Sequence, residues 1–318
     1  MGRRIYLNND WYFNESFSEE MLQSGYDFKK NECVRIPHTV KETPLHYFDE
    51  HAYQKIAAYF RVINVPEEWR DKDVFLTFDG VLHSCVVFVN GKEAGTHLCG
   101  YTAFTINLSG LINIGIDNII MVKADSREDQ NLPPFGFVID YMTYGGIYRD
   151  VYVDVKEKAH FDDIFVSGDA EGNIRVEISA SKEANGMIVE NSIISLKKNE
   201  DGILVSGEEK SLGEGEFYPD EGKEECVKTY KFDNPALWDT VHPNLYILRS
   251  VLKDATGKIV DENKVRFGFR SAVFKADGFY LNGEKFKIRG LNRHQSYPYV
   301  GYAMPKNAQA NDAKILKE

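Results

Sequence analysis

The sequence predicts an all-β protein, with a jelly-roll-like β-sandwich followed by an immunoglobulin-like β-sandwich and then the beginning of a third unit. Short runs of alternating apolar and polar residues recur as far as residue 272, with turn residues between them. Helical periodicity is nearly absent from the same region. Many short strands at this spacing are typical of sandwiches and jelly rolls.

The first region, residues 1–156, contains clear strand patterns. The dipeptide Asn90-Gly91 closes one of these runs and is a strong signal for a two-residue hairpin turn. A single helical turn is predicted at Pro66–Trp69. The expected strands include Val74–Phe78, Cys85–Val89, Phe104–Leu108, Asn118–Ala124 and Tyr148–Val155.

A long irregular stretch, Asp125–Gly146, separates two of these strands. It contains Pro133-Pro134, acidic residues near its start and several aromatic residues. Long loops of this kind are usually functional or disordered, and the aromatic content argues against disorder. We therefore expect a functional loop here.

The second region, residues 157–272, repeats the pattern of short strands. Ile174–Ile178 alternates apolar and polar residues, and Asn191–Leu196 is a second run of strand length. About seven short strands in a region of this length favour an immunoglobulin-like sandwich. Gly207–Lys228 is rich in Gly, Glu and Lys, so we expect an exposed loop or an edge.

The third region, residues 273–318, has a different pattern. A hairpin at Asn282-Gly283 leads into an expected strand, Phe286–Arg289, and then into the polar cluster Gly290–Gln295. A helix is predicted over Asn307–Glu318. A strand that ends in polar residues resembles the start of an α/β barrel, which needs about 250 residues. We therefore expect the chain to stop inside this third domain.

Composition excludes several classes of function. The formal net charge is −11 with a pI of about 5.3, and Lys and Arg are scattered, which argues against nucleic acid or an anionic membrane as a partner. No signal peptide or membrane-length apolar run is visible, so the expected location is the cytoplasm. The four cysteines lack CxxC spacing and are expected to be reduced and mostly buried.

Four stretches together resemble glycoside hydrolase family 2, the group of β-galactosidases, β-glucuronidases and β-mannosidases. They are similar, in order, to the core hairpin of that family's sugar-binding jelly roll, its closing strand, its immunoglobulin-like domain, and the first strand and loop of its catalytic barrel. The stretches are Phe78–Gly95, Tyr144–Val151, Asn234–Tyr246 and Arg289–His294. The run Asn-Arg-His-Gln-Ser-Tyr-Pro favours the β-galactosidase-like members.

This resemblance implies three domains. They are a jelly-roll sugar-binding domain at residues 1–156, an immunoglobulin-like sandwich at 157–272, and the start of a truncated (β/α)8 TIM barrel at 273–318. It also implies a function as the N-terminal, non-catalytic portion of a retaining β-glycosidase that hydrolyses terminal β-D-galactosides.

Retaining glycosidases use two carboxyl groups about 5–5.5 Å apart. In the family that the chain resembles, both glutamates come from later barrel strands, and the acid/base follows an Asn. The Asn-Glu pairs Asn14-Glu15, Asn31-Glu32 and Asn199-Glu200 have no barrel context, so we expect exposed turns there. We thus predict no catalytic residue in this chain and no glycoside hydrolysis by this chain alone.

The candidate substrate residues are His294, Asn292 and Asp129. By resemblance, His294 donates a hydrogen bond to a sugar hydroxyl and stabilises charge in the transition state, although a buried structural histidine is the alternative. Asn292 orients the loop, and Arg293 is expected to be a supporting ion-pair partner. Asp129, a solvated loop acid in the alternative interpretation, is chosen for ligand contact over Asp125 and Glu128, and Asp140 is expected to be structural or supporting.

Other polar and aromatic residues receive structural predictions. Arg149 and Asp150 are expected to form a structural pair on their strand. Aromatic side chains can stack on sugars, but alternating strands routinely bury them, so we expect core positions. The residues concerned are Trp69, Tyr101, Phe104 and Trp238.

The expected partner is a carbohydrate, a β-galactoside-like substrate, and a homo-oligomer is left open. No cofactor is assigned, and Mg or Na in the full-length enzyme is the open alternative. A different class of function is a pair of stand-alone carbohydrate-binding modules without hydrolase activity. A cell-surface adhesion protein is a third interpretation, but a sandwich has no use for an unfinished strand–helix unit.

Overall fold

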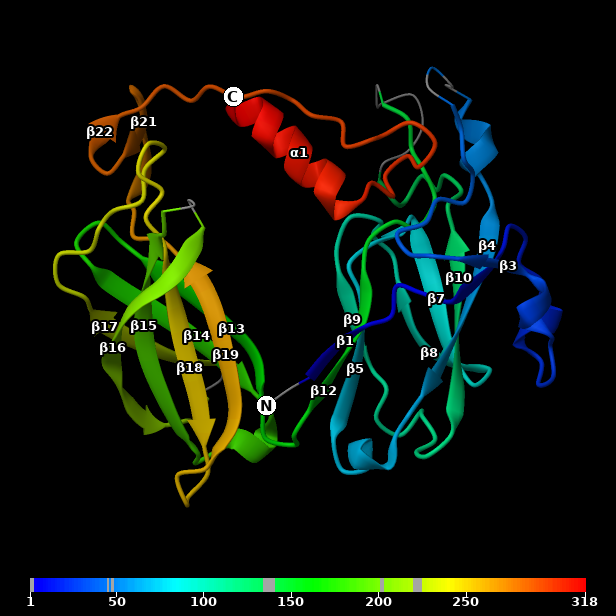
Figure 1. Ribbon diagram of the computed structural model, residues 1–318, viewed down its shortest axis with the longest axis horizontal. Helices are drawn as coiled ribbons and strands as arrows, with labels where there is room; N and C mark the ends of the chain where they lie inside the picture. The colour runs from blue at the N-terminus through cyan, green and yellow to red at the C-terminus, as the bar shows by residue number, and fades with distance from the viewer. Residues whose placement is uncertain (1–2, 45, 47–48, 134–140, 201–202, 220–224) are drawn as a thin grey trace. The chain divides into compact units, whose positions relative to one another are not determined.

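The computed structural model describes the chain apart from residues 1–2, 45, 47–48, 134–140, 201–202 and 220–224 (Figure 1). The prediction of an almost entirely β protein is confirmed, since α1 (Lys306–Lys317) is the one α-helix of the described residues. The chain divides into two compact units. The first unit combines Arg3–Val155 with Asn292–Glu318, and the second unit is Lys156–Leu291.

Among its described residues, the first unit contains a four-stranded sheet, a six-stranded antiparallel sheet and a short two-stranded sheet. In order, the four-stranded sheet contains β1 (Arg3–Tyr6), β12 (Val151–Lys156), β5 (Asp73–Phe78) and β9 (Phe104–Asn107). The six-stranded sheet contains β3 (Glu32–Val34), β2 (Trp11–Asn14), β4 (Ile56–Asn64), β10 (Asp117–Asp125), β7 (Ser84–Val89) and β8 (Lys92–His97). The short sheet pairs β11 (Gly146–Ile147) with β6 (Val81–Leu82).

One hydrophobic core joins the two large sheets of the first unit. Along β7 the side chains of Cys85, Val87 and Val89 are buried, while the residues between them are half-buried. Successive side chains of a strand point to opposite faces, so this alternation places one face of β7 in the core. The same core contains Leu76 from β5 and Val153 from β12, as expected of a sandwich.

Turns in the first unit follow the sequence signals. Asn90 and Gly91 have φ of 53° and 80°, which are the left-handed values that a type I′ hairpin requires. The predicted helical turn is η4 (Glu67–Trp69), and Trp69 is buried. The other short 3₁₀ helices of the described residues are η1 (Glu19–Leu22), η2 (Phe28–Lys30), η3 (Glu50–Tyr53) and, in the second unit, η6 (Lys182–Ala184).

The second unit is also a β-sandwich, with a three-stranded sheet, a four-stranded sheet and a terminal hairpin sheet. The three-stranded sheet is β13 (Phe161–Gly168), β14 (Asn173–Ala180) and β17 (Glu225–Lys231). The four-stranded sheet is β16 (Leu204–Glu216), β15 (Ile188–Lys198), β18 (Tyr246–Lys253) and β19 (Ile259–Phe267). The hairpin sheet is β20 (Ala272–Lys275), β21 (Gly278–Leu281) and β22 (Glu284–Lys285).

The stretch Gly207–Lys228 is an edge rather than a loop over most of its described length. β16 and β17 are edge strands of their two sheets, and most of β16 is exposed. The polar composition therefore identified solvent exposure correctly, but strand pairing with β15 and β14 orders the backbone.

In the third region, residues 273–318, the predicted hairpin and helix are confirmed and the predicted strand is wrong. The hairpin at Asn282 and Gly283 forms between β21 and β22, and α1 forms where a helix was predicted. Phe286–Arg289 is not a strand. Ile288 is 61% exposed, and a strand requires a neighbouring strand to accept and donate its backbone hydrogen bonds. The predicted domain boundaries after residues 156 and 272 stay predictions.

None of the described helices has the length and the apolar character needed to cross a membrane.

Candidate functional site

The segment that follows the polar cluster packs into the first sandwich. Tyr302 is 7% exposed, and its ring centroid lies 4.7 Å from that of Tyr144 and 6.0 Å from that of Tyr148. Ala303 and Met304 are buried beside it. Aromatic rings at these separations contribute about 0.5–1.5 kcal/mol per pair beyond the area that they bury. Tyr302 therefore anchors the segment on the first sandwich.

Gly301 allows this close packing. Its φ is +54°, and a Cβ built on it would lie 2.3 Å from the Tyr144 ring. The Tyr302 hydroxyl donates a hydrogen bond to the Met142 carbonyl at 3.3 Å, and burial raises the pKa of Tyr302 to about 12. The phenol is thus a neutral donor at physiological pH.

An ion pair between Lys306 and Asp150 holds the start of α1. The Asp150 side chain is 7% exposed and also accepts a hydrogen bond from Asn8 Nδ2 at 3.0 Å. The hydrogen bond to Asp150 raises the pKa of Lys306. Burial, and then the charge of Asp150, raise the pKa of the neighbouring Asp79 carboxyl.

Arg149 has different partners from Asp150, which corrects the predicted pair. Arg149 Nη1 donates to the Tyr101 carbonyl at 3.4 Å, and its guanidinium lies 4.9 Å from the centroid of the Tyr148 ring. Both residues precede β12 rather than lying on it, and their charged groups reach different surroundings.

Arg293 connects the polar cluster to α1. Its Nε donates to Asp312 Oδ2 at 3.0 Å, and its Nη2 donates to Gln309 Oε1 at 2.9 Å. The structure thus supplies an ion-pair partner for the residue that we expected to form one. Asn292, the preceding residue, is exposed.

His294 lies against the long loop between β10 and β11. Its ring centroid is 5.3 Å from that of Tyr141, with 45° between the ring planes. His294 itself is exposed, so its polar atoms remain accessible. Two stretches that the sequence singled out separately, the loop and the polar cluster, therefore meet at this pair.

Asp129 stabilises its own turn. Its Oδ1 accepts hydrogen bonds from the backbone N of Asn131 at 2.8 Å and from Asn131 Nδ2 at 3.0 Å. The side chain is exposed, but no described side-chain contact joins it to His294. Its sugar-binding role stays a prediction. Asp140 lies outside the described residues.

A buried histidine that the sequence did not reveal lies between β6 and β7, next to the start of the same loop. His83 is 3% exposed, and its backbone N donates to the Asp125 carbonyl at 2.8 Å. Burial lowers the pKa of His83, although the carboxylates of Glu128 and Asp125 oppose this effect. Within the described part of the chain, His83 Nε2 has no hydrogen-bond partner. The sequence around His83 reads as two short strands, so the only signal that could have marked it as a site residue is that it is a histidine.

A cavity of about 270 Å³ lies beside the anchored segment. It includes Gln295, the residue after His294, and both members of the Lys306–Asp150 ion pair. The remaining lining residues are Pro37, Asp79, Tyr148, Arg149, Tyr302, Met304 and Gln309. Sequence reasoning missed Tyr302 and Lys306, although aromatic residues recur at positions 297, 299 and 302.

The predicted aromatic core positions are only partly buried. Trp69 is buried as expected, whereas Tyr101, Phe104 and Trp238 are half-buried. Phe104 stacks on Phe78 with centroids 5.1 Å apart, so it packs as a core residue does.

The described residues contain no group of three or more His, Cys, Asp or Glu side chains arranged to hold a metal. All four cysteines are free; Cys85 and Cys226 are buried, Cys99 is half-buried and Cys33 is exposed. The expectation of mostly buried thiols holds for two of the four.

Comparison with known proteins identifies the family. The family model "Glycosyl hydrolases family 2, sugar binding domain" matches residues 18–156, and "Glycosyl hydrolases family 2" matches residues 159–270. The β-galactosidase of Thermoanaerobacterium thermosulfurigenes is 39% identical over 329 aligned positions, covering 100% of this chain and 44% of that protein. The β-galactosidase of Thermoanaerobacter pseudethanolicus is 36% identical over 326 positions, covering 100% and 42%.

A solved structure agrees in fold. The crystal structure of a Bacteroides uniformis β-glucuronidase superposes with a TM-score of 0.79 at 24% identity, covering 100% of this chain and 38% of that one. The chain thus spans less than half the length of the relatives that it matches. The two family models and the two β-galactosidases agree: the chain belongs to glycoside hydrolase family 2.

Proposed function

We propose that this chain is the non-catalytic, N-terminal portion of a retaining β-glycosidase that hydrolyses terminal β-D-galactosides. The observation that carries the proposal is the contact between His294 and Tyr141, 5.3 Å between ring centroids, with His294 exposed. A galactoside is the favoured substrate because two relatives, at 39% and 36% identity, are β-galactosidases.

In this proposal the chain forms one wall of a sugar site. Tyr302 and the Lys306–Asp150 ion pair hold the segment after the polar cluster, and the Arg293–Asp312 ion pair holds the cluster against α1. His294 then needs little reorganisation to donate a hydrogen bond to a sugar hydroxyl. A donor fixed before the reaction stabilises developing charge without reorganisation at the moment of reaction.

Bond cleavage requires two carboxyl groups about 5–5.5 Å apart, one as nucleophile and one as acid/base. We propose that both belong to a barrel domain of the same protein, of which residues 273–318 form the first part. In the barrel, Phe286–Arg289 would pair with neighbouring strands and become extended. α1 would then cover the barrel with Ile315 and Leu316, which are 62% and 56% exposed here.

The experiment is to measure kcat/KM of the full-length gene product and of the 318-residue chain on three nitrophenyl glycosides. We expect the full-length protein to prefer the β-galactoside over the β-glucuronide and the β-mannoside, and the chain alone to release no nitrophenol. Preference for either other glycoside would contradict the proposed substrate. Turnover by the chain alone would contradict the non-catalytic role.

The second candidate is a pair of stand-alone carbohydrate-binding modules, favoured by the match of residues 18–156 to a sugar-binding domain. The parent gene decides between them. An Asn-Glu pair about a hundred residues beyond residue 318, with a second glutamate later, would support the glycosidase; their absence would support the binding modules. Cytoplasmic location, oligomeric state and a Mg or Na requirement stay predictions.

A further inference from the structure

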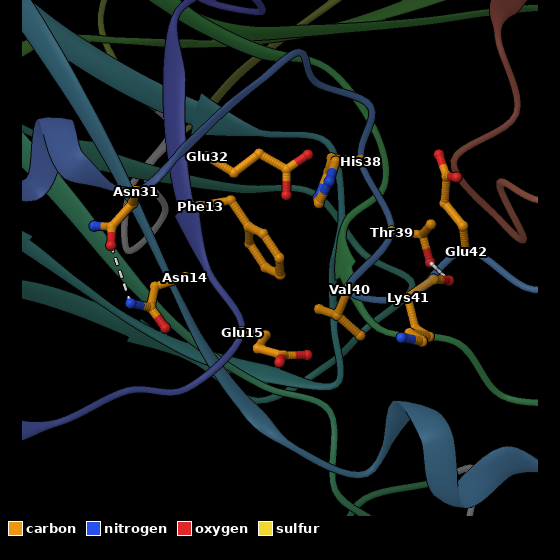
Figure 2. A pocket seen from close by; sticks show the side chains of 10 residues that line it. All are labelled: Phe13, Asn14, Glu15, Asn31, Glu32, His38, Thr39, Val40, Lys41 and Glu42. Carbon is orange, nitrogen blue, oxygen red and sulfur yellow. Dashed lines mark hydrogen bonds between the residues drawn. The ribbon is translucent and has the colours of Figure 1, made fainter.

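A second, larger cavity of about 510 Å³ opens on the first unit (Figure 2). Small-molecule sites typically measure about 300–1,000 Å³. The cavity shares no lining residue with the predicted cluster at His294 or with the cavity beside Tyr302. Its lining residues are Phe13, Asn14, Glu15, Asn31, Glu32, His38, Thr39, Val40, Lys41 and Glu42.

Two of the Asn-Glu pairs predicted to be exposed turns form one wall of this cavity. Asn14 ends β2 and Glu32 begins β3, and these strands are paired. Asn14 Nδ2 donates a hydrogen bond to Asn31 Oδ1 at 3.0 Å, which joins the two pairs. Figure 2 shows Glu15 and Glu32 on this wall, with Phe13 between them. Strand pairing therefore sets the backbone positions from which the two glutamate side chains extend.

The opposite wall is the segment from His38 to Glu42, and its first residues are held firmly. The Phe13 ring lies 4.7 Å from that of His38, centroid to centroid. His38 Nδ1 lies 3.0 Å from the Tyr59 hydroxyl, and Thr39 Oγ1 donates to the Lys41 carbonyl at 3.2 Å. Phe13 and Thr39 are 8% and 5% exposed. Buried contacts thus fix the floor of the cavity, while its charged side chains are exposed.

The charge of the lining restricts what can bind. Three carboxylates, of Glu15, Glu32 and Glu42, face one ammonium group, of Lys41. Lys55, outside the lining, pairs with Glu15 at 3.2 Å. Burial lowers the pKa of His38 to about 4, so its ring is neutral at pH 7. The surplus of negative charge disfavours phosphates, sulfates and uronates, because like charges repel.

The ligand chemistry that fits this cavity is a set of neutral hydroxyl groups. A carboxylate has about four lone-pair sites and accepts hydrogen bonds from two adjacent hydroxyls, and a side-chain amide both donates and accepts. The buried Phe13 provides an apolar floor. We propose that this cavity binds a neutral saccharide of one or two units, with Glu32 as its principal hydrogen-bond acceptor. The site goes beyond the proposed function because none of its lining residues belongs to the proposed sugar site at His294.

The test is saturation-transfer NMR and calorimetry on the 318-residue protein with methyl β-D-galactopyranoside, cellobiose and D-glucuronate at pH 7. Two variants address the cavity. Glu32→Ala removes the acceptor, and Glu42→Trp fills the opening from an exposed position. Glu20→Gln, at an exposed carboxyl on η1 outside the lining, is the matched control. Thermal melting of each variant verifies its fold.

At least one neutral saccharide is expected to bind in the millimolar range, with D-glucuronate binding more weakly. Glu32→Ala should weaken binding by about tenfold, as expected for losing one hydrogen bond to a charged group. Glu42→Trp should weaken binding, and Glu20→Gln should not. Absence of binding by both neutral saccharides, stronger binding of D-glucuronate, or binding unchanged in both cavity variants would each overturn the proposal. None of these outcomes depends on glycosidase activity.

Discussion

Tyr302 packs against Tyr144 with 4.7 Å between the ring centroids, although 157 residues lie between them in the sequence. Tyr144 precedes β11 at the end of the long loop, and Tyr302 follows the polar cluster by a few residues. This contact belongs to one compact unit. It is the reason that the polar cluster of the third region lies on the first sandwich.

Replacing Tyr302 by Ala should release the anchored segment. Loss of a large buried aromatic side chain costs about 3–5 kcal/mol, so we expect undocking of the segment rather than unfolding of the sandwich. Hydrogen exchange measures this effect. The amides of Tyr299 and Ala303, which donate to Thr43 and Val300 carbonyls, should lose protection, while amides of β7 keep theirs.

Tyr302→Phe is the matched control for that variant. It removes only the 3.3 Å hydrogen bond to the Met142 carbonyl and should cost about 1 kcal/mol or less. Equal protection of the Ala303 amide in the Ala variant and in the wild type would show that Tyr302 is not the anchor.

Gly301→Ala should produce the same undocking without removing any side chain. The new Cβ would lie 2.3 Å from the Tyr144 ring, on a residue with φ of +54°. Gly290→Ala is the control, since a Cβ there meets no atom within 4 Å. Limited proteolysis between residues 292 and 304 should become faster in Gly301→Ala alone. Equal cleavage rates in the two variants would be inconsistent with close packing at Gly301.

The stability of the first unit should fall in mild acid because of His38. Its pKa in the folded protein is about 4, and burial is the cause, whereas the unfolded value is 6.5. The unfolded chain therefore binds the extra proton first, so stability is full above about pH 6.5 and is lost as pH falls toward 4. The loss should be about 1–3 kcal/mol.

Urea denaturation at pH 7.5 and pH 5 measures this loss. His38→Phe should flatten the difference between the two pH values, and His242→Gln, at an exposed histidine, should leave the difference nearly unchanged. An identical pH dependence in the wild type and in His38→Phe would contradict the assignment to His38.

The four thiols should differ in reactivity with iodoacetamide. A hydrogen bond from Thr102 lowers the pKa of Cys99, whereas burial raises the pKa of Cys85 to about 12. The thiolate is the nucleophile, so Cys99 and the exposed Cys33 should react first, and buried Cys85 and Cys226 only after unfolding. Mass spectrometry of the alkylated peptides checks this order. Early labelling of Cys85 in the native protein would contradict the described core.

The sequence predicted elements well where a local rule determines the structure. Alternation identified β7, the dipeptide Asn90-Gly91 identified its hairpin turn, and helix formers identified α1. The prediction of a strand at Phe286–Arg289 failed because a strand depends on a partner strand that is distant in sequence. The local pattern does not reveal whether that partner is present.

The site was predictable only in part for the same reason. His294 stood out by its residue type within a polar cluster, and Asp129 by its acidic loop. The ion pair between Lys306 and Asp150 joins residues far apart in the sequence, and no local pattern predicted that they pair. The cavity beside Phe13 likewise depends on the pairing of β2 with β3, which brings together two Asn-Glu pairs that were predicted to be exposed turns.

The most direct test of the central claim is kcat/KM of the full-length protein on nitrophenyl β-D-galactoside after His294→Ala. His242→Ala, at an exposed histidine of the second unit, is the control. If the anchored His294 supports the transition state, its loss should lower kcat/KM by about 10²–10³ while His242→Ala stays near the wild type. A His294→Ala variant within about twofold of the wild type, well under 1 kcal/mol, would contradict the account.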